Sequence, residues 1–388
     1  MMTELVDGNC IALLTRGSEY FPALEAECDA ARHEIHIETY IFEDDSAGRR
    51  IAAALMRAAQ RGVATHLLVD GYGSKKLNSG LVAGMQDAGV RFLVYRPDIS
   101  PWTFQRRRLR RMHRKLAVID ARVAFVGGIN IIDEMHTPNQ TPPRFDYAVR
   151  IEGPLLRNIH PVVRRLWTLV EFTQLGQDWH DRTSLQADGE HCGNQRAAFL
   201  IRDNLRHRSD IEEAYLEAIS GARSEILIAS SYFFPGLSFR RALTEAAARG
   251  VRVVLLLQGK VEYVLLHYAS HALYGAFLDA GIEIHEYRKS FLHAKVAVID
   301  RHWATVGSSN IDPLSLLLAR EANVVIEDRE FAATLHQSLA AAMGAGAHQV
   351  LRERWKDQPL AQRAAMWLCY GLARLLTGIS GYGGAREV

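Results

Sequence analysis

The stretch His113-Arg-Lys-Leu-Ala-Val-Ile-Asp120 occurs a second time in this chain, as His293-Ala-Lys-Val-Ala-Val-Ile-Asp300. Both copies fit the pattern His-x-Lys-x-x-x-x-Asp. A glycine and an asparagine follow each copy at the same distances: Gly127 and Asn130 in the first, Gly307 and Asn310 in the second. All five matched positions are displaced by 180 residues, which is not expected by chance. The chain is therefore an internal duplication, and the duplicated part carries the chemistry.

The repeat extends well beyond the two motifs. The segment 31–37 is echoed by 222–228, and 61–69 is echoed by 249–257. In each copy, segments with the alternating pattern of strands are followed by segments with helical spacing. This order predicts an α/β fold with two duplicated α/β/α sandwich domains and mixed, mostly parallel sheets. We expect a pseudo-twofold axis between the domains, because only that packing brings both motifs into one shared active site.

The length also favours two domains, since 388 residues exceed what a single hydrophobic core usually supports. The polar segment 176–196 is the best candidate for the boundary. We expect an N-terminal domain over residues 1–185, a C-terminal domain over 186–350 and an amphipathic tail over 351–388. The tail is too interrupted to span a bilayer. It either lies in the membrane interface or packs as a helix on the protein.

Composition and charge narrow the class of protein. A hydrophobic content of 48% and a charged content of 23% describe an ordinary folded protein, and a net charge of +2 says little about partners. The four cysteines are scattered, so we expect reduced thiols and no disulfide framework. We expect neither a signal peptide nor an N-terminal anchor, because no basic segment with a long apolar run opens the sequence.

The motif residues suit chemistry on a phosphodiester. If each motif forms one strand, His113 and Lys115 share a face, and so do His293 and Lys295. The two lysines and the two asparagines can then hold the nonbridging phosphate oxygens as charge builds in the transition state. One histidine can attack phosphorus while the other protonates the departing alcohol.

Four carboxylates accompany this set. Asp120 and Asp300 complete the catalytic motifs but fall on the opposite face of the strand, so we interpret them as structural residues at its end. A nucleophilic imidazole needs a carboxylate on its other nitrogen. Asp146 and Glu321, each next to an expected strand of its own repeat, are the candidates for these orienting groups. The chemistry requires no metal or cofactor, and no clustered ligand set is evident.

A dense positive block, Gln105–Lys115, leads directly into the first motif. Beside a phosphate site such a block can bind anionic headgroups or nucleic acid. Five other histidines show no convergent pattern in the sequence, and we interpret them as incidental: His33, His36, His66, His160 and His191.

The motifs resemble those of the phospholipase D superfamily, and within it the chain closely resembles the bacterial cardiolipin synthases, especially the B type. The segments that also carry this likeness are Glu38–Asp45, Val69–Ser74, Asp146–Pro154, Ser231–Pro235, Val306–Leu316 and Glu321–Val324. The likeness runs from about residue 8 to residue 350. The A type carries N-terminal membrane spans, so their absence here favours the B type.

The resemblance implies a phosphatidyltransferase, with phosphatidylglycerol as typical donor and acceptor, cardiolipin as product and glycerol released. It implies that His113 is the nucleophile, forming a covalent phosphohistidine, and that His293 is the general acid and base. The residues that it places on the phosphate are Lys115, Lys295, Asn130 and Asn310. Ser308 stands where the first copy has Gly128, so a hydroxyl contact is expected only from the second half.

The resemblance further implies anionic phospholipids and the membrane surface as partners, no cofactor, and a peripheral position on the cytoplasmic side of the cell membrane. The main alternative is a superfamily phosphodiesterase acting on nucleic acid, which the basic block would serve equally well. The missing aromatic stacking pattern and the apolar tail favour a lipid. Hydrolysis to phosphatidic acid is another alternative, whereas a scaffold with an inactive site conflicts with two intact motifs. The oligomeric state stays open.

Overall fold

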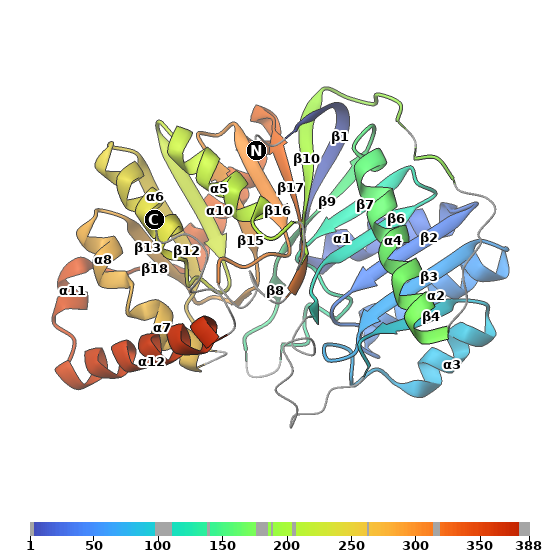
Figure 1. Cartoon of the computed structure of the whole chain (residues 1–388), viewed down its shortest axis with the longest axis horizontal. Helices are drawn as coiled ribbons and strands as arrows, with labels where there is room; N and C mark the ends of the chain where they lie inside the picture. The colour runs from blue at the N-terminus through green and yellow to red at the C-terminus, as the bar shows by residue number, and fades with distance from the viewer. Residues whose placement is uncertain are drawn as a thin grey trace.

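The computed structural model of the chain describes residues 4–97, 111–137, 140–175, 185–187, 189–203, 207–261, 264–312 and 319–379, without the side chains of residues 175, 354, 356 and 377–379. Within that part of the chain, a 16-stranded sheet runs through both copies of the repeat (Figure 1). The protein is therefore built around one continuous sheet rather than around two separate ones.

The first copy holds nine strands and four helices among the described residues. Its strands are β1 (Val6–Thr15), β2 (Glu34–Thr39), β3 (Ala64–Asp70), β4 (Arg91–Tyr95), β5 (Arg111–Met112), β6 (Lys115–Ile119), β7 (Val123–Gly127), β8 (Arg144–Phe145) and β9 (Tyr147–Glu152). Its helices are α1 (Arg16–Ala30), α2 (Ser46–Gln60), α3 (Ser79–Asp87) and α4 (Leu156–Leu175).

The second copy repeats this order and adds the tail. Its strands are β10 (Gln195–Arg202), β11 (Glu225–Ser230), β12 (Arg252–Gln258), β13 (Glu283–Tyr287), β14 (Phe291–Leu292), β15 (Lys295–Ile299), β16 (Trp303–Gly307), β17 (Ala319–Glu327) and β18 (Ala347–Gln349). Its helices are α5 (Asp210–Gly221), α6 (Leu237–Ala248), α7 (Val264–His271), α8 (Tyr274–Asp279) and α10 (Arg329–Gly346), and the tail forms α11 (Arg352–Lys356) and α12 (Leu360–Ile379).

Helix α2 shows how local sequence sets these elements. Asp45 caps its first turn by accepting a hydrogen bond from the Gly48 backbone N–H at 2.9 Å. The helix buries Ile51 and Leu55 against the sheet, as its apolar spacing predicts. It ends before Gly62, whose φ of +88° is the left-handed conformation that glycine adopts readily.

The sheet is mixed, as expected, but its parallel part is smaller than expected. The strand order is β18-β13-β12-β11-β15-β16-β17-β10-β1-β9-β7-β6-β2-β3-β4, with β5 paired to β17. Long parallel pairs occur only within β2-β3-β4 and β11-β12-β13 over the described residues. The reason is that β6–β7 and β15–β16 are tight antiparallel hairpins, whose three-residue turns (120–122 and 300–302) lack glycine. Asp120 and Ala121 take φ values of +52° and +51° in the first turn.

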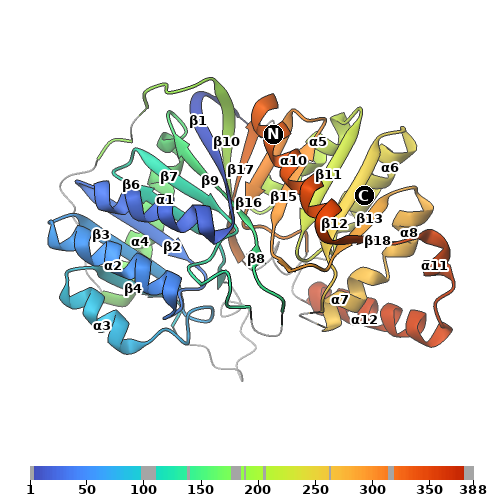
Figure 2. The same cartoon turned by 180° about the vertical axis from the view of Figure 1, so that it is seen from behind.

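The two copies join edge to edge through the antiparallel pair β1–β10. One hydrophobic core crosses this junction, because Val149 and Ile151 of the first copy belong to the same buried cluster as Val324 and Ile326 of the second. Helix α4 lies on the face seen in Figure 1, whereas α10, its counterpart in the second copy, lies on the face seen in Figure 2. Helices therefore cover both faces, which agrees with the expected α/β/α layers.

The division at residue 185 stays a prediction. Part of the expected boundary, residues 176–184 and 188, lies outside the described residues. The sheet pairing adds that β1 bonds both to β9 of its own copy and to β10 of the other. Any division of the chain into two units therefore cuts through a hydrogen-bonded sheet.

Three of the histidines interpreted as incidental are not independent of one another. His36 and His160 both reach Glu34, at 3.5 Å and 2.5 Å, under helix α4. The ring of His66 stacks on His36 with centroids 4.4 Å apart. Burial, the largest cause, lowers the pKa of His66 to about 3. A sequence cannot reveal this cluster, because its members lie on three elements that only the fold brings together.

We predict that His66 makes the protein acid-sensitive. Its pKa is lower in the folded chain than its ordinary value of 6.5, so between pH 6.5 and about 3 the unfolded state binds more protons and stability falls as pH falls. His66→Leu should reduce the slope of unfolding free energy against pH in this range by up to about 1.4 kcal/mol per pH unit. Urea unfolding at several pH values measures the slope. The exposed His348→Leu is the control, and an unchanged slope in His66→Leu would contradict the assignment.

Candidate active site

Each motif histidine lies where the chain changes its pairing partner. The short strand β5 pairs with β17 of the other copy, and the His113 backbone N–H donates to the Arg320 carbonyl at 2.9 Å. Strand β14 pairs with β8 in the same way, and the His293 N–H donates to the Phe145 carbonyl at 2.8 Å. The expectation of one continuous strand through the motif is wrong, because the chain leaves the other copy between His and Lys. Pairing within its own copy resumes at Lys115 or Lys295.

The two orienting carboxylates act across the copies. His113 Nδ1 lies 2.9 Å and 3.1 Å from the two carboxylate oxygens of Glu321, which belongs to β17 of the second copy. His293 Nδ1 lies 2.6 Å from Asp146 Oδ2, which precedes β9 of the first copy. The sequence identified these carboxylates but placed each with its own repeat. The structure brings each one to the histidine of the opposite copy.

The two histidine side chains are partly exposed, whereas the carboxylates behind them are sealed from solvent. The side chains of Glu321 and Asp146 are 0% and 3% exposed, whereas those of His113 and His293 are 16% and 13% exposed. Because Nδ1 of each ring faces the sealed carboxylate, Nε2 is the nitrogen that can meet a substrate. Each carboxylate thus contacts its imidazole from the buried side, an arrangement that suits control of ring orientation and tautomer.

The two motif lysines lie beside their histidines and are almost fully buried. Lys115 Nζ donates to the His113 carbonyl at 2.5 Å, and Lys295 Nζ donates to the His293 carbonyl. Lys295 also lies 3.8 Å from Asp146. The ammonium groups are therefore held in place before any substrate binds, close to where the imidazoles emerge.

The two motif asparagines are buried at corresponding positions. Asn130 Oδ1 accepts from the Ile41 backbone N–H at 3.1 Å, and Asn310 Oδ1 accepts from the Ser231 hydroxyl at 3.2 Å. Ile41 and Ser231 lie on the segments that follow β2 and β11. Each asparagine thus ties the motif loop to the end of a central parallel strand.

The structure places the hydroxyl of Ser308, for which we expect a phosphate contact, against Glu321. Its buried hydroxyl donates to Glu321 Oε2 at 2.5 Å and accepts from the Ala322 N–H at 3.1 Å, so it supports the carboxylate instead. In the first copy, a Cβ on Gly128 would lie 2.3 Å from Asp146 Oδ1. The shorter aspartate therefore requires glycine at this position, whereas the longer glutamate accommodates the serine.

Asp120 and Asp300 each accept several backbone hydrogen bonds. Asp120 accepts backbone hydrogen bonds from residues 32, 33 and 34, at 2.8 to 3.0 Å. Asp300 accepts the equivalent bonds from residues 223, 224 and 225, at 2.8 to 2.9 Å. Each aspartate therefore fastens the hairpin turn after its motif to the start of a central strand. This geometry agrees with their interpretation as structural residues.

Burial dominates the electrostatics of the site. It is the largest cause lowering the pKa of His113 and of His293 below the ordinary value, and the lysines of both copies lower these pKa values further. Burial lowers the pKa of Lys115 to about 7 and raises that of Asp146 to about 6. The groups of the two copies therefore act on one another as a single cluster. Neutral imidazoles are favoured at neutral pH.

Two further residues support the first motif, and the motif spacing did not single them out. Buried Asp70 accepts from the Met112 N–H at 2.9 Å and from the Tyr72 N–H at 2.9 Å, which fixes β5 beside the turn after β3. The Tyr40 ring packs edge-on against the His113 ring with centroids 4.8 Å apart. Lys115 Nζ lies 5.4 Å from the centre of the same ring.

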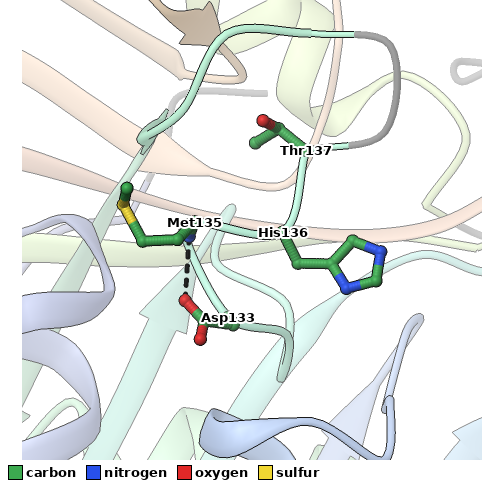
Figure 3. Close-up of a pocket in the computed structure, with 4 residues that line it drawn as sticks. All are labelled: Asp133, Met135, His136 and Thr137. Atoms are coloured by element: carbon green, nitrogen blue, oxygen red, sulfur yellow. Dashed lines mark hydrogen bonds between the residues drawn. The ribbon is translucent and has the colours of Figure 1, made fainter.

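Two groups of side chains in the described part of the chain have donors close enough to hold a metal ion. The first is the buried group of Glu34, His36 and His160, where the 2.5 Å contact of Glu34 with His160 has the length of a hydrogen bond. The second, Glu43, Asp45 and His136, adjoins an open hollow lined by Asp133, Met135, His136 and Thr137 (Figure 3). Neither group includes a motif residue.

The structure describes most of the tail but only part of the basic block. Residues 105–110 of the block lie outside the described residues, so its expected role stays a prediction. The tail forms α12, which packs along α7. No helix over the described residues combines the length and the apolar character needed to cross a membrane.

Known proteins match this chain over most of its length. A family model described as "Cardiolipin synthase, PLD-like domain" matches residues 24–141 and 215–343. The chain is 40% identical over 361 residues to Cardiolipin synthase B of Escherichia coli K12, covering 93% of this chain and 85% of that protein. It is 42% identical to Cardiolipin synthase B of Salmonella typhi, covering 86% and 80%.

Solved structures support the fold. Phosphatidylserine synthase from Haemophilus influenzae superimposes with a TM-score of 0.66 at 12% identity, covering 95% of this chain and 94% of that chain. A polyphosphate kinase from Porphyromonas gingivalis gives a TM-score of 0.58 at 15% identity, covering 95% and 53%. At these identities the likeness concerns the architecture alone.

We predict that each orienting carboxylate is essential to the histidine of the other copy. Asp146→Asn and Glu321→Gln keep the size of the side chain but remove its charge, so each should lower kcat by roughly 10²- to 10⁴-fold. Steady-state kinetics on the folded variants measure this loss. The exposed Asp87→Asn and Glu217→Gln are matched controls and should behave as wild type. Wild-type kcat in either buried variant would rule out its orienting role.

Proposed function

Because this chain belongs to the family of cardiolipin synthases with a phospholipase D-like domain, we propose that it is a phosphatidyltransferase that makes cardiolipin. Phosphatidylglycerol is the proposed donor and acceptor, and glycerol is the second product. The observation that carries this proposal is the pair of histidines, each backed by a carboxylate from the other copy and flanked by a buried lysine. A phosphodiester is the substrate that uses all of these groups.

In the first step, His113 Nε2 attacks the phosphorus of one phosphatidylglycerol. The bond between phosphorus and the glycerol headgroup oxygen breaks, and His293 gives its proton to that oxygen as glycerol leaves. The negative charge of the bound phosphodiester, together with Asp146, favours the protonated form of His293 that this step requires. The phosphatidyl group is then bonded to His113. Glu321 stabilises the positive charge that develops on this ring, since its carboxylate lies 2.9 Å from Nδ1.

In the second step, His293 acts as the base. It takes a proton from the headgroup hydroxyl of a second phosphatidylglycerol, whose oxygen attacks the phosphorus and releases His113. The product is cardiolipin, and His293 is again protonated for the next cycle. Asp146, 2.6 Å from the His293 ring, supports the protonated form.

Lys115 and Lys295 neutralise the nonbridging oxygens in both steps, and we assign the amide groups of Asn130 and Asn310 to the same oxygens. The Asn130 carbonyl oxygen accepts from the protein backbone, so its NH2 is the group suited to donate to a phosphate. Ser308 acts on this set only through Glu321.

The other activities considered from the sequence are less well supported. A nuclease of the same superfamily would use the same groups, but the curated relatives at 40% and 42% identity bear the name cardiolipin synthase. Hydrolysis differs from transfer only in the entering hydroxyl and is a side reaction of the same site. We propose that the enzyme works as a peripheral protein on the cytoplasmic face of the cell membrane, on phosphatidylglycerol and cardiolipin.

We predict that the purified protein converts phosphatidylglycerol in vesicles to cardiolipin and glycerol in equal amounts. His113→Ala and His293→Ala should each abolish the conversion while the fold stays intact, because each removes one of two indispensable imidazoles. Separation of lipids and of water-soluble products measures both. Phosphatidic acid without cardiolipin would make the protein a hydrolase, and cleavage of single-stranded DNA without either lipid product would make it a nuclease.

We predict further that the two histidine variants differ in the intermediate. With phosphatidylglycerol labelled at phosphorus, His293→Ala retains the nucleophile and should trap protein-bound label that is stable to alkali and lost in acid. His113→Ala should trap none. Rapid quenching followed by denaturing electrophoresis measures the label. Label on His113→Ala but not on His293→Ala would exchange the two assignments.

A further inference from the structure

Helix α12 has one face packed on the protein and one face left in solvent. Met366 and Ala373 are buried, and the Tyr370 ring packs against Phe234 with centroids 5.5 Å apart. The other face carries six exposed large apolar side chains: Leu360, Trp367, Leu368, Leu372, Leu375 and Leu376. Leu368 is 75% exposed and Leu375 is 60% exposed, so the helix displays them rather than tucking them against the sheet.

The charge of α12 complements an anionic surface. The helix contains no aspartate or glutamate, and its charged residues are Arg363 and Arg374. Tryptophan and arginine on an otherwise leucine-rich helix are typical of helices that lie in the headgroup region of a bilayer. In water alone, six such side chains on one helix would form an apolar patch that a monomeric protein rarely leaves uncovered.

A series of direct contacts links α12 to the active site. Phe234, which packs against Tyr370, donates its backbone N–H to the Ile311 carbonyl at 2.7 Å. Ser231 of the same segment holds the side chain of the motif residue Asn310. The helix thus rests on the segment that shapes one wall of the site.

Other exposed apolar side chains extend the patch from α12 toward the site. Val264 begins α7, which lies along α12, and Val261 precedes it; they are 60% and 47% exposed. The Val261 carbonyl accepts from the Gln140 side chain, and the Gln140 backbone N–H donates to the Thr137 carbonyl at 2.9 Å. Met135, two residues before Thr137, is 59% exposed. Figure 1 places α7, α12 and the segment before β8 at the same lower edge of the molecule.

We propose that this surface, the outer face of α12 together with Val261, Val264 and Met135, is where the protein docks on an anionic lipid bilayer. The inference rests on the proposed function and specifies how the site receives its substrate. A lipid whose headgroup lies between His113 and His293 keeps its acyl chains in the membrane, so the docking surface must adjoin the site. α12 satisfies this condition through the 231–234 segment.

The test uses the full-length protein with vesicles of equal parts phosphatidylglycerol and phosphatidylcholine. The double variant Leu368→Glu/Leu375→Glu places two negative charges on the docking face and should reduce co-sedimentation with vesicles by at least about tenfold. The control Ala248→Glu/Ala340→Glu adds the same charges at exposed positions of α6 and α10, and should bind as wild type. Thermal unfolding of both variants verifies that the fold is kept.

Activity separates this proposal from the proposed function. On short-chain, monomeric phosphatidylglycerol the docking variant should turn over as wild type does, whereas on vesicles it should lose activity in proportion to binding. A wild-type protein inactive on both substrates would overturn the proposed function, while vesicle binding still tests the surface. Vesicle binding by the docking variant equal to that of wild type would falsify the docking role. If the wild-type protein is a dimer and the docking variant is a monomer that still binds vesicles as wild type does, the face contacts a second copy of this chain instead of the membrane.

Discussion

The hydrogen bonds between His113 and Glu321 and between His293 and Asp146 are the constraint on which the rest of the structure depends. Each joins a histidine of one copy to a buried carboxylate of the other. A buried carboxylate without a partner is costly, so neither copy can place its own carboxylate well without the other. The pairs β5–β17 and β8–β14, the continuous sheet and the shared core hold the two copies at the distance that these contacts require.

The two copies repeat the same order of strands and helices, but the surroundings of their two motif histidines differ. Gly128 leaves room for Asp146, whereas Ser308 adds a hydroxyl to the longer Glu321. Arg114, next to His113, forms a buried ion pair with Glu38, and both positions are alanine in the second copy, Ala294 and Ala229. Such differences allow one imidazole to act as nucleophile while its counterpart carries the proton. Two identical environments would give two equal pKa values and no division of roles.

The sequence alone predicted the features that the repeat encodes directly. Matched spacing identified the motif residues and the two carboxylates, and the alternation of strand-like and helical segments predicted the α/β class. It could not show that the carboxylates cross between copies, because spacing within a repeat carries no information about its partner. It also missed the Glu34 cluster and the role of Ser308, which depend on side-chain packing between elements distant in the chain.

The electrostatics of the site explain why an anion belongs there. Two lysines and two histidines, all largely buried, face two buried carboxylates, and burial lowers the pKa of Lys115 to about 7. A phosphodiester brings the negative charge that this set lacks, favours the protonated lysines and thereby strengthens its own binding. Because the site excludes water on the carboxylate side, that attraction is little screened. A phospholipid that stays in the membrane inserts only its headgroup into the site. It therefore brings little bulk water to the charged groups there.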